Sequence, residues 1–347
     1  MTSNSPAPLL LDEVLDPAWL QRTLAPTGLI DGPVEDVTIT ETLKTSATKV
    51  RFAIHSNGRQ IALCVKGFFD APLREVAAAI SQSEVRFYQE IAPSTDLRLP
   101  DCVYSAVDPE TGHGLLIMRD MVAQGGRFLN VLYPYSPKQG EGSLGQLAII
   151  HAASWGEEKV RKHEFLRSRV EWLLENPLIS LEDLQALLDG ERGEPLPASV
   201  RDAKRLVRGV EVISGRIRSQ TPCVIHGDAH PGNILEIDGK QGLVDWQLVQ
   251  RGNWSLDVSY HIIASLSVED RRAQERPLLE HYLGALAATG AEAPSFEQAW
   301  EQYRAHLVYG YYLWALTRGV AAPITHELVR RLGLAAADHD SFRLLGC

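Results

Sequence analysis

The sequence lacks three features that mark common classes of protein: an excess of positive charge, paired cysteines and a long apolar run. Its formal net charge is -10, which argues against nucleic-acid and anionic-membrane partners, because both need a basic surface. The four cysteines are scattered without a Cys-x-x-Cys pair, so we expect reduced thiols and neither a disulfide framework nor a zinc knuckle. No apolar run approaches the roughly 20 residues that a membrane-spanning helix needs.

The N-terminal stretch MTSNSPAPLLLDEV has no basic segment and turns acidic before an apolar region could form. This is not the pattern of a secretory signal, and we therefore expect a cytoplasmic protein. Hydrophobic residues make up 45% of the 347 residues and charged residues 22%, which is typical of a globular protein with a sizeable core. A chain of this length forms one large domain or two lobes.

Strand patterns dominate the first third of the chain. Three stretches that alternate or are rich in β-branched and apolar residues are expected to form an antiparallel meander: residues 34–43, 49–55 and 60–69. The dipeptide Asn57-Gly58 between the last two is the strongest short-range hairpin signal. Before the sheet, residues 15–26 are expected to form a short helix with Asp16 as its N-cap and Pro17 at its first position.

After this sheet, the apolar residues recur at helical spacing. This spacing predicts a helix over residues 74–92, ended by Pro93, and two further strand candidates follow at 102–107 and 114–121. A Gly- and Pro-rich passage over residues 123–145 is expected to connect two lobes, and amphipathic segments follow it. We therefore predict three parts: an N-terminal segment (1–30), a sheet-containing lobe (31–121) and a mainly helical lobe (122–347).

A second hairpin signal lies in CVIHGDAHPGNILEIDGKQGLVDWQ, residues 223–247. Asp238-Gly239 is a two-residue turn, and pairing outward from it places Asn233 opposite Val244. Asp245 follows directly, and strand spacings of about 5 Å bring it within reach of Asn233.

Asp228 lies five residues before Asn233, in the loop that leads into this hairpin. Two carboxylates and a carboxamide are thereby expected at one end of the hairpin, and their hard oxygen atoms suit Mg²⁺ better than zinc. The same spacing occurs in the protein-kinase loop H-R-D-x-x-x-x-N, in which the Asp takes the proton of the acceptor hydroxyl and the Asn binds Mg²⁺. Asp245 stands where a kinase places a further metal-binding Asp.

The pattern His-Gly-Asp-x-x-x-x-Asn, followed by a hairpin and an Asp, resembles the aminoglycoside phosphotransferase and choline kinase group of small-molecule kinases. The longer motif HGDAHPGNIL…LVDWQ is most similar to that of the ecdysteroid-kinase-like branch. The resemblance covers residues 30–320 and implies an α+β, bilobal protein-kinase-like fold, with a small antiparallel sheet and one helix in the N-lobe and a mainly helical C-lobe. It implies that Asp228 is the catalytic base and that Asn233 and Asp245 bind Mg²⁺.

The same resemblance bears on four other residues near this loop and implies a supporting role for two of them. His226 and Asp257 are expected to hold the loop rather than to take part in the chemistry. For His230, a scaffold role and a substrate-side role both stay open. His151 resembles a family position near the loop, and a buried core histidine is the favoured interpretation.

A kinase-like site also needs a cation on the nucleotide phosphates and a carboxylate that holds this cation. Lys66 in the third strand and Glu84 in the following helix are the predicted pair, and the resemblance supports both. Glu75 and Glu90 are weaker candidates for the carboxylate.

The loop over residues 43–50 contains no glycine where many kinases have a Gly-rich phosphate cover. Thr45 and Ser46 are expected to present hydroxyl and N–H groups to the phosphates instead. By resemblance, the hinge between the lobes lies near the second strand candidate, where the backbone from Met118 to Met121 would bind the adenine.

The region over residues 296–314 is rich in Tyr and Trp. Aromatic residues at helical spacing are more often core than pocket, but if some of them line a pocket the acceptor is partly apolar. A cationic acceptor held over aromatic faces also stays open.

We therefore predict a phosphotransferase that uses ATP and Mg²⁺ to move the γ-phosphoryl group to a hydroxyl of a small molecule, without nucleic-acid or membrane partners. Two alternatives stay open. One is a nucleotide-binding pseudokinase without turnover, and the other is a zinc hydrolase that uses the cluster from His226 to His230. The pattern indicates neither the identity of the acceptor nor the oligomeric state.

Overall fold

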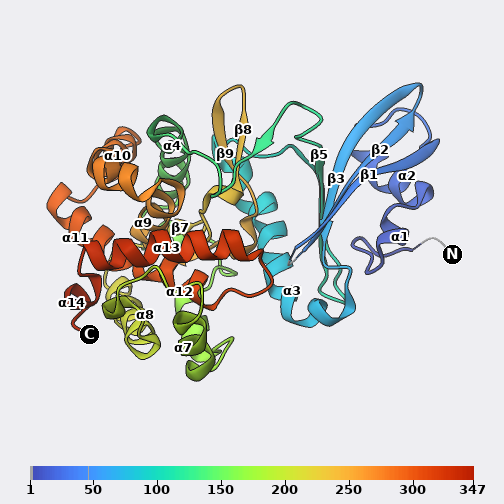
Figure 1. Ribbon diagram of the computed structural model, residues 1–347. Coiled ribbons are helices and arrows are strands. Elements are labelled where there is room, and N and C mark those ends of the chain that lie inside the picture. The colour runs from blue at the N-terminus through green and yellow to red at the C-terminus, as the bar shows by residue number, and fades with distance from the viewer. Residues whose placement is uncertain (1–2, 46) are drawn as a thin grey trace. The chain divides into compact units, whose positions relative to one another are not determined.

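A five-stranded antiparallel sheet organises the N-terminal part of the protein (Figure 1). The strands lie in the order β1-β2-β3-β5-β4, and their bounds are β1 Asp36–Lys44, β2 Thr48–Ser56, β3 Arg59–Gly67, β4 Cys102–Val107 and β5 Gly114–Arg119. Asn57 and Gly58 form the β2–β3 turn with φ values of 50° and 71°, which confirms the predicted hairpin. This computed structural model describes residues 3–45 and 47–347, without the side chains of residues 71–77.

The chain divides into two compact units. Unit 1 contains the sheet and is built from the residues up to Ser94, Leu99–Arg127 and Asp245–Gln247; unit 2 is built from Thr95–Arg98, Phe128–Val244 and Leu248–Cys347. The short segment Asp245–Gln247 therefore belongs to unit 1, although it directly follows a hairpin of unit 2 in the sequence.

Short helices complete unit 1. They are α1 Leu11–Val14, α2 Pro17–Leu24 and α3 Ala71–Arg86, and α3 continues as a π-helical turn over Phe87–Ile91. Asp16 accepts a hydrogen bond from the Trp19 N–H at 2.9 Å, which confirms it as the N-cap of α2. Buried side chains of α2 and of the sheet share one apolar cluster, which includes Trp19, Leu20, Phe52, Leu63 and Ile117.

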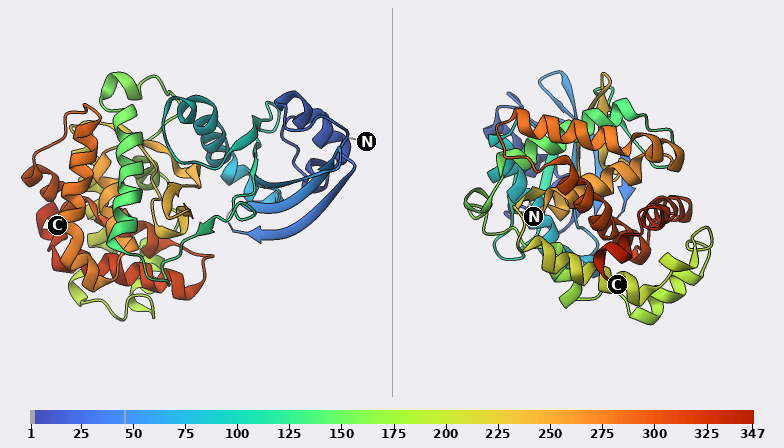
Figure 2. Two further views of the ribbon diagram at one scale, coloured as in Figure 1. Left: turned by 90° about the horizontal axis from the view of Figure 1, so that it is seen from above. Right: turned by 90° about the vertical axis from the view of Figure 1, so that its left-hand side faces the viewer.

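Unit 2 is built around α9, Trp254–Ser265, a helix in which every residue is buried. The other helices of this unit are α4 Pro137–Ala153, α5 Glu157–Val160, α6 Arg169–Glu175, α7 Leu181–Asp189, α8 Ala203–Ile217, α10 Val268–Ala288, α11 Phe296–His306, α12 Val308–Leu316, α13 Ala322–Asp338 and α14 Ser341–Leu345. Five of them, α4, α10, α11, α12 and α13, contact α9 (Figures 1 and 2). A residue on α9 is therefore held from several sides.

The segment over residues 223–247, which the sequence analysis identified, contains short strands. In unit 2, β7 Cys223–Ile225 pairs with β10 Gln250–Gly252, and β8 Ile234–Ile237 pairs with β9 Lys240–Leu243; the two-residue strand β6 spans Arg127–Phe128. Ile237 pairs with Lys240, and the Val244 N–H donates to the Asn233 carbonyl at 3.0 Å. The predicted hairpin register is therefore confirmed.

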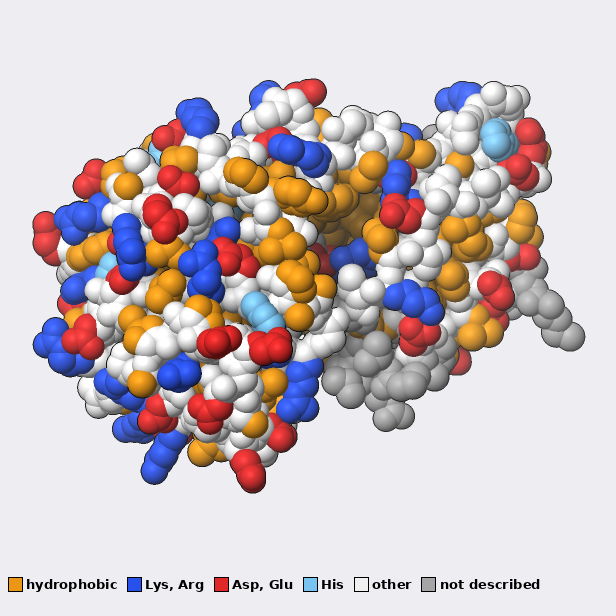
Figure 3. All heavy atoms as spheres, in the orientation of Figure 1, with side chains coloured by type: hydrophobic (Ala, Val, Ile, Leu, Met, Phe, Trp, Pro, Cys, Tyr) orange, Lys and Arg blue, Asp and Glu red, His pale blue; other side chains and the backbone are white. Residues whose placement is uncertain are grey.

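Charged side chains of both signs are scattered over the face of unit 2 that Figure 3 presents, between apolar patches. Within residues 3–45 and 47–347, no helix combines the length and the apolar character that crossing a membrane requires.

The prediction of a connector over residues 123–145 is wrong for its second half. Helix α4 already begins at Pro137, with Ser136 as its N-cap. Two of its glycines lie at close contacts between elements. A Cβ at Gly140 would lie 3.5 Å from Leu278 of α10. At Gly142 it would lie 2.0 Å from the Gln241 side chain of β9. Composition alone does not separate a glycine in a turn from a glycine at a helix contact.

Two glycine substitutions test this packing. A Cβ at Gly310 of α12 would lie 2.6 Å from the ring of Tyr260 on α9, whereas nothing lies within 4 Å of a Cβ at Gly284 of α10. We expect Gly310→Ala to lower the free energy of unfolding by about 1–3 kcal/mol through overpacking. Gly284→Ala is the matched control and should raise it by about 0.5–1 kcal/mol. Urea unfolding of both variants measures the difference, and equal effects would contradict the close α9–α12 contact.

Candidate active site

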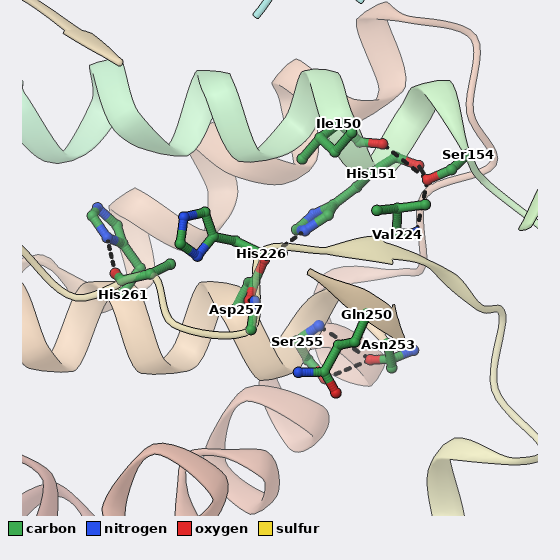
Figure 4. Close-up of polar contacts among 12 residues, drawn as sticks. Ile150, His151, Ser154, Val224, His226, Gln250, Asn253, Ser255, Asp257 and His261 are labelled. Carbon is green, nitrogen blue, oxygen red and sulfur yellow. Dashed lines mark hydrogen bonds and ion pairs between the residues drawn. The ribbon is translucent and has the colours of Figure 1, made fainter. Parts of the chain in front are cut away.

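A buried carboxylate on α9 holds the start of the predicted catalytic loop (Figure 4). Asp257 accepts hydrogen bonds from the backbone N–H groups of His226 (2.6 Å) and Gly227 (2.8 Å). Its third partner is His151 of α4, whose Nε2 lies 3.2 Å away and whose Nδ1 contacts the Tyr282 hydroxyl. Burial alone would raise the pKa of Asp257, but His151 and the loop N–H groups hold it below its usual value. The carboxylate therefore stays ionised inside the unit.

The imidazole of His226 links two parts of this loop region. Its Nε2 lies 2.9 Å from the Val244 carbonyl, and the Asp228 N–H lies 3.2 Å from its Nδ1. Because a carbonyl only accepts and an amide N–H only donates, Nε2 carries the proton and Nδ1 the lone pair. His226 thus ties Asp228 to the residue that directly precedes Asp245. Both ring nitrogens are used, so a zinc hydrolase centred on His226 is not favoured.

Asp228 is surrounded by hydrogen-bond donors of unit 2, and its side chain is 21% exposed. The Tyr260 hydroxyl donates to Oδ1 at 2.9 Å. The Asn233 side-chain amide donates to the Asp228 carbonyl at 2.8 Å and reaches Oδ2 at 3.3 Å. His230 Nε2 lies 3.7 Å from Oδ2. The carboxylate thus has one short side-chain hydrogen bond, on Oδ1, and longer contacts on Oδ2.

In unit 1, Lys66 of β3 lies between two carboxylates. Its Nζ is 2.5 Å from Glu84 of α3 and 2.6 Å from Oδ1 of Asp245, and its side chain is 4% exposed. Burial alone would lower the pKa of Lys66, but the two carboxylates raise it above its usual value. Burial alone would likewise raise the pKa of Asp245, but the neighbouring lysines hold it well below its usual range. Both groups therefore stay charged at neutral pH.

Lys49 is a member of this cluster that the sequence reasoning missed. It lies on β2 directly opposite Lys66, and its Nζ is 2.9 Å from Oδ2 of Asp245. Two lysines opposite each other across a sheet repel, unless an anion lies between them. The signal was present, because pairing outward from Asn57-Gly58 sets Lys49 against Lys66.

The segment after Asp245 is anchored to the end of α3. The Trp246 N–H donates to Glu84 Oε1 at 3.0 Å, so Glu84 contacts both Lys66 and this backbone. The ring of Trp246 stacks on that of Phe87 at 3.9 Å between centroids. Among the candidate carboxylates, Glu84 thus contacts Lys66 in the structure, whereas Glu90 forms an ion pair with Arg86, and the Glu75 side chain lies outside the described residues.

The predicted nucleotide-binding residues have these positions in unit 1. Thr45 is exposed, and its hydroxyl donates to a backbone carbonyl two residues along, at 3.0 Å. Ser46 lies outside the described residues. Met118 is half-buried near the end of β5, and the carbonyl of Met121 accepts a hydrogen bond from the Gly126 N–H at 2.8 Å. Their roles stay predictions.

The aromatic side chains near the C-terminus are buried rather than arranged around a pocket. Tyr303, Tyr309, Tyr311, Tyr312 and Trp314 are each 5% exposed or less. The Tyr309 hydroxyl donates to the Gly227 carbonyl at 2.8 Å, so this core also supports the loop. Over the part of the chain that the structure describes, no group of three His, Cys, Asp or Glu side chains is placed to hold a metal ion.

Comparison with known proteins gives one family and several similar folds. Residues 52–306 match the phosphotransferase enzyme family. An uncharacterized kinase-like protein of Caenorhabditis elegans is 37% identical over 90 residues, and this match spans only 24% of each chain.

Among solved structures, the ethanolamine kinase of Plasmodium vivax matches with a TM-score of 0.51 and 12% identity, over 91% of this chain and 86% of the other. The choline kinase LicA of Streptococcus pneumoniae matches with a TM-score of 0.48 and 14% identity, over 89% and 94%. At such identities a likeness shows the fold alone, and the first of the two confirms the expected α+β, kinase-like fold.

Replacing Asp257 tests the anchoring of the loop. Asp257→Asn removes the charge that three donors converge on and should lower the free energy of unfolding by about 2–4 kcal/mol near neutral pH. The folded-state pKa of Asp257 is depressed, so its contribution is complete above the unfolded-state pKa of about 3.9 and is lost as the pH falls through the folded-state pKa. Unfolding curves as a function of pH measure both effects.

Asp238→Asn is the matched control, because Asp238 is exposed in the turn of the hairpin and Asn tolerates its positive φ of 50° equally well. The control should leave stability nearly unchanged. If the difference in the free energy of unfolding between the wild-type protein and Asp257→Asn stays constant as the pH falls, this would contradict an ionised Asp257.

Proposed function

Since the chain belongs to the phosphotransferase enzyme family, we propose that it transfers the γ-phosphoryl group of ATP, with Mg²⁺, to a hydroxyl of a small molecule. The observation that carries the proposal is the set of contacts at Asp228. A carboxylate on an anchored loop, with one oxygen held by Tyr260 and the other only loosely contacted, can take a proton from a bound hydroxyl. Phosphoryl transfer needs such a group and needs positive charge around the phosphates.

Asp228 takes the proton of the acceptor hydroxyl while the hydroxyl oxygen attacks the γ-phosphorus. The new bond from oxygen to phosphorus forms as the bond from the γ-phosphorus to the ADP oxygen breaks, so ADP leaves with the electron pair. His226 and Asp257 act by holding the backbone from which Asp228 projects. The base is thus placed before the acceptor binds.

Asn233 and Asp245 are the Mg²⁺ ligands in this proposal. Their oxygens are the hard ligands that this ion prefers, and the depressed pKa of Asp245 keeps its carboxylate free of a proton. The amide nitrogen of Asn233 is the atom engaged with Asp228, which leaves its oxygen as the metal-binding atom. When bound, the metal neutralises charge on the phosphate oxygens.

Lys66 is the cation on the nucleotide phosphates, held by Glu84. Lys49 is the second cation and compensates for the absence of glycine in the loop over residues 43–50, since a lysine supplies attraction where a Gly-rich loop supplies backbone N–H groups. Thr45 and Ser46 are proposed as neighbouring phosphate contacts, and the backbone from Met118 to Met121 as the adenine contact.

The acceptor is proposed to be a small hydroxylated molecule. Because Tyr309, Tyr311 and Trp314 are buried, the aromatic region gives no support for a partly apolar acceptor. The ring of His230 lies beside Asp228, in a T-shaped arrangement with that of Trp314 at 5.2 Å between centroids. A nucleic acid or a membrane is not proposed as a partner, because the net charge is -10, and a cytoplasmic location stays part of the proposal. A pseudokinase would share these contacts but would show no turnover.

A screen of hydroxylated compounds for Mg²⁺-dependent ADP release tests the proposed function. With an active acceptor, Asp228→Asn should lower kcat by about 100-fold or more, because the proton acceptor is lost. Asp238→Asn makes the same chemical change on the exposed turn between β8 and β9, away from Asp228, and should keep full activity. Full turnover of Asp228→Asn would rule out the proposed base, and ATP binding without turnover on any acceptor would favour the pseudokinase.

Lys49 gives an independent test of the phosphate site. Lys49→Met should raise the Kd of ADP by about 10-fold, through the loss of one charge contact to a phosphate, while the Kd of adenosine stays unchanged. Lys204→Met, at an exposed position of α8, is the control for removing one positive charge. Titration calorimetry measures both ligands, and an equal loss for ADP and adenosine would mean that Lys49 shapes the fold and does not bind phosphate.

A further inference from the structure

Tyr260 of α9 lies between the predicted base and a buried tryptophan. Its hydroxyl donates to Asp228 Oδ1 at 2.9 Å and accepts a hydrogen bond from Nε1 of Trp314 on α12. Tyr260 has no exposed surface, and Trp314 is 5% exposed. Three side chains from three segments of the sequence thus form one chain of hydrogen bonds that ends on the carboxylate.

The direction of this chain follows from counting protons. An indole N–H only donates, so the Tyr260 oxygen must accept from Trp314. A phenol has a single proton, and an ionised carboxylate only accepts, so that proton lies on the bond to Asp228. Burial, followed by the charge of Asp228, raises the pKa of Tyr260 well above its usual value, so the phenol keeps its proton at neutral pH. Tyr260 is therefore a fixed donor to Oδ1.

The two oxygens of Asp228 differ as a result. Oδ1 has the short hydrogen bond from Tyr260, whereas Oδ2 has contacts of 3.3 Å to Asn233 and 3.7 Å to His230. The backbone N–H of Gly232 donates to Nδ1 of His230 at 3.1 Å, so the Nε2 that faces Oδ2 carries a proton when the ring is neutral. The weakly contacted Oδ2 is the oxygen with capacity for a new proton.

We propose that Tyr260, itself held by Trp314, is a positioning residue that fixes Asp228 Oδ1 and so presents Oδ2 to the acceptor hydroxyl. The inference rests on the proposed function, in which Asp228 is the base. Tyr260 touches neither reactant. It acts by preventing rotation of the carboxylate, so that Oδ2 keeps one position before the acceptor binds.

A purely structural role for the hydroxyl makes a different prediction. Phe at position 260 fills the same volume and keeps the aromatic contact with Tyr309, whose ring lies edge-on at 6.4 Å between centroids. If the hydroxyl serves only the core, its loss reduces the amount of folded protein and leaves kcat per folded molecule unchanged. If it positions the base, its loss lowers kcat of the folded protein while the KM for ATP stays the same.

The test compares kcat and KM, measured per folded molecule, for the wild-type protein and Tyr260→Phe, with an acceptor found in the screen. We expect kcat to fall by about 10-fold, the size of one hydrogen bond to a charged group, with the KM for ATP unchanged.

Tyr303→Phe is the matched control, because Tyr303 is also fully buried and its hydroxyl also donates to a carboxylate, that of Glu275, at 3.1 Å. It should lose stability while its kcat per folded molecule stays unchanged. Trp314→Phe is the second variant if Tyr260→Phe does not fold; it removes the donor behind Tyr260 and should lower kcat by a smaller factor.

The outcomes separate the inference from the function it rests on. An unchanged kcat in a folded Tyr260→Phe protein, or in Trp314→Phe where that variant decides, overturns the role of Tyr260 and leaves the phosphotransferase proposal intact. Absence of phosphoryl transfer by the wild-type protein overturns the proposed function itself.

Discussion

The convergence of three donors on Asp257 is the interaction on which the candidate site depends. A carboxylate with no exposed surface is stable only when its charge is balanced, and here two backbone N–H groups and His151 provide that balance. Because the two N–H groups belong to His226 and Gly227, the same contacts fix the backbone directly before Asp228. Helix α9 carries Asp257 and also Tyr260, so one buried element holds both the loop and the side chain of Asp228.

Val244 of unit 2 and Asp245 of unit 1 are adjacent in the sequence. His226 binds the carbonyl of Val244, and the next residue is Asp245, which in unit 1 lies on Lys66 and Lys49. Asp245 has a positive φ of 67°, which a non-glycine residue adopts only when its surroundings hold it there. The cluster of two lysines and two acids in unit 1 keeps positive charge next to the buried carboxylate of Asp245.

Local signals in the sequence predicted much of this. Asn57-Gly58 and Asp238-Gly239 each set the register of a hairpin, because a two-residue turn leaves the pairing no freedom. Tertiary neighbours were not predictable in the same way: Tyr260 and Trp314 are 54 residues apart, and no periodicity indicates that their polar atoms meet at Asp228. The misassigned second half of the passage over residues 123–145 has the same cause, since Gly140 and Gly142 pack against α10 and β9, which are distant in the sequence.

Hydrogen exchange at the amides of His226 and Gly227 tests the central claim most directly. If Asp257 fixes the loop, these two N–H groups open only when α9 itself unfolds, and we expect them to exchange with the free energy of the slowest amides of α9. Their protection should fall in Asp257→Asn while the amides of the β2–β3 hairpin in unit 1 keep theirs. Exchange of the two amides through a local opening several kcal/mol easier than that of α9 would contradict the claim.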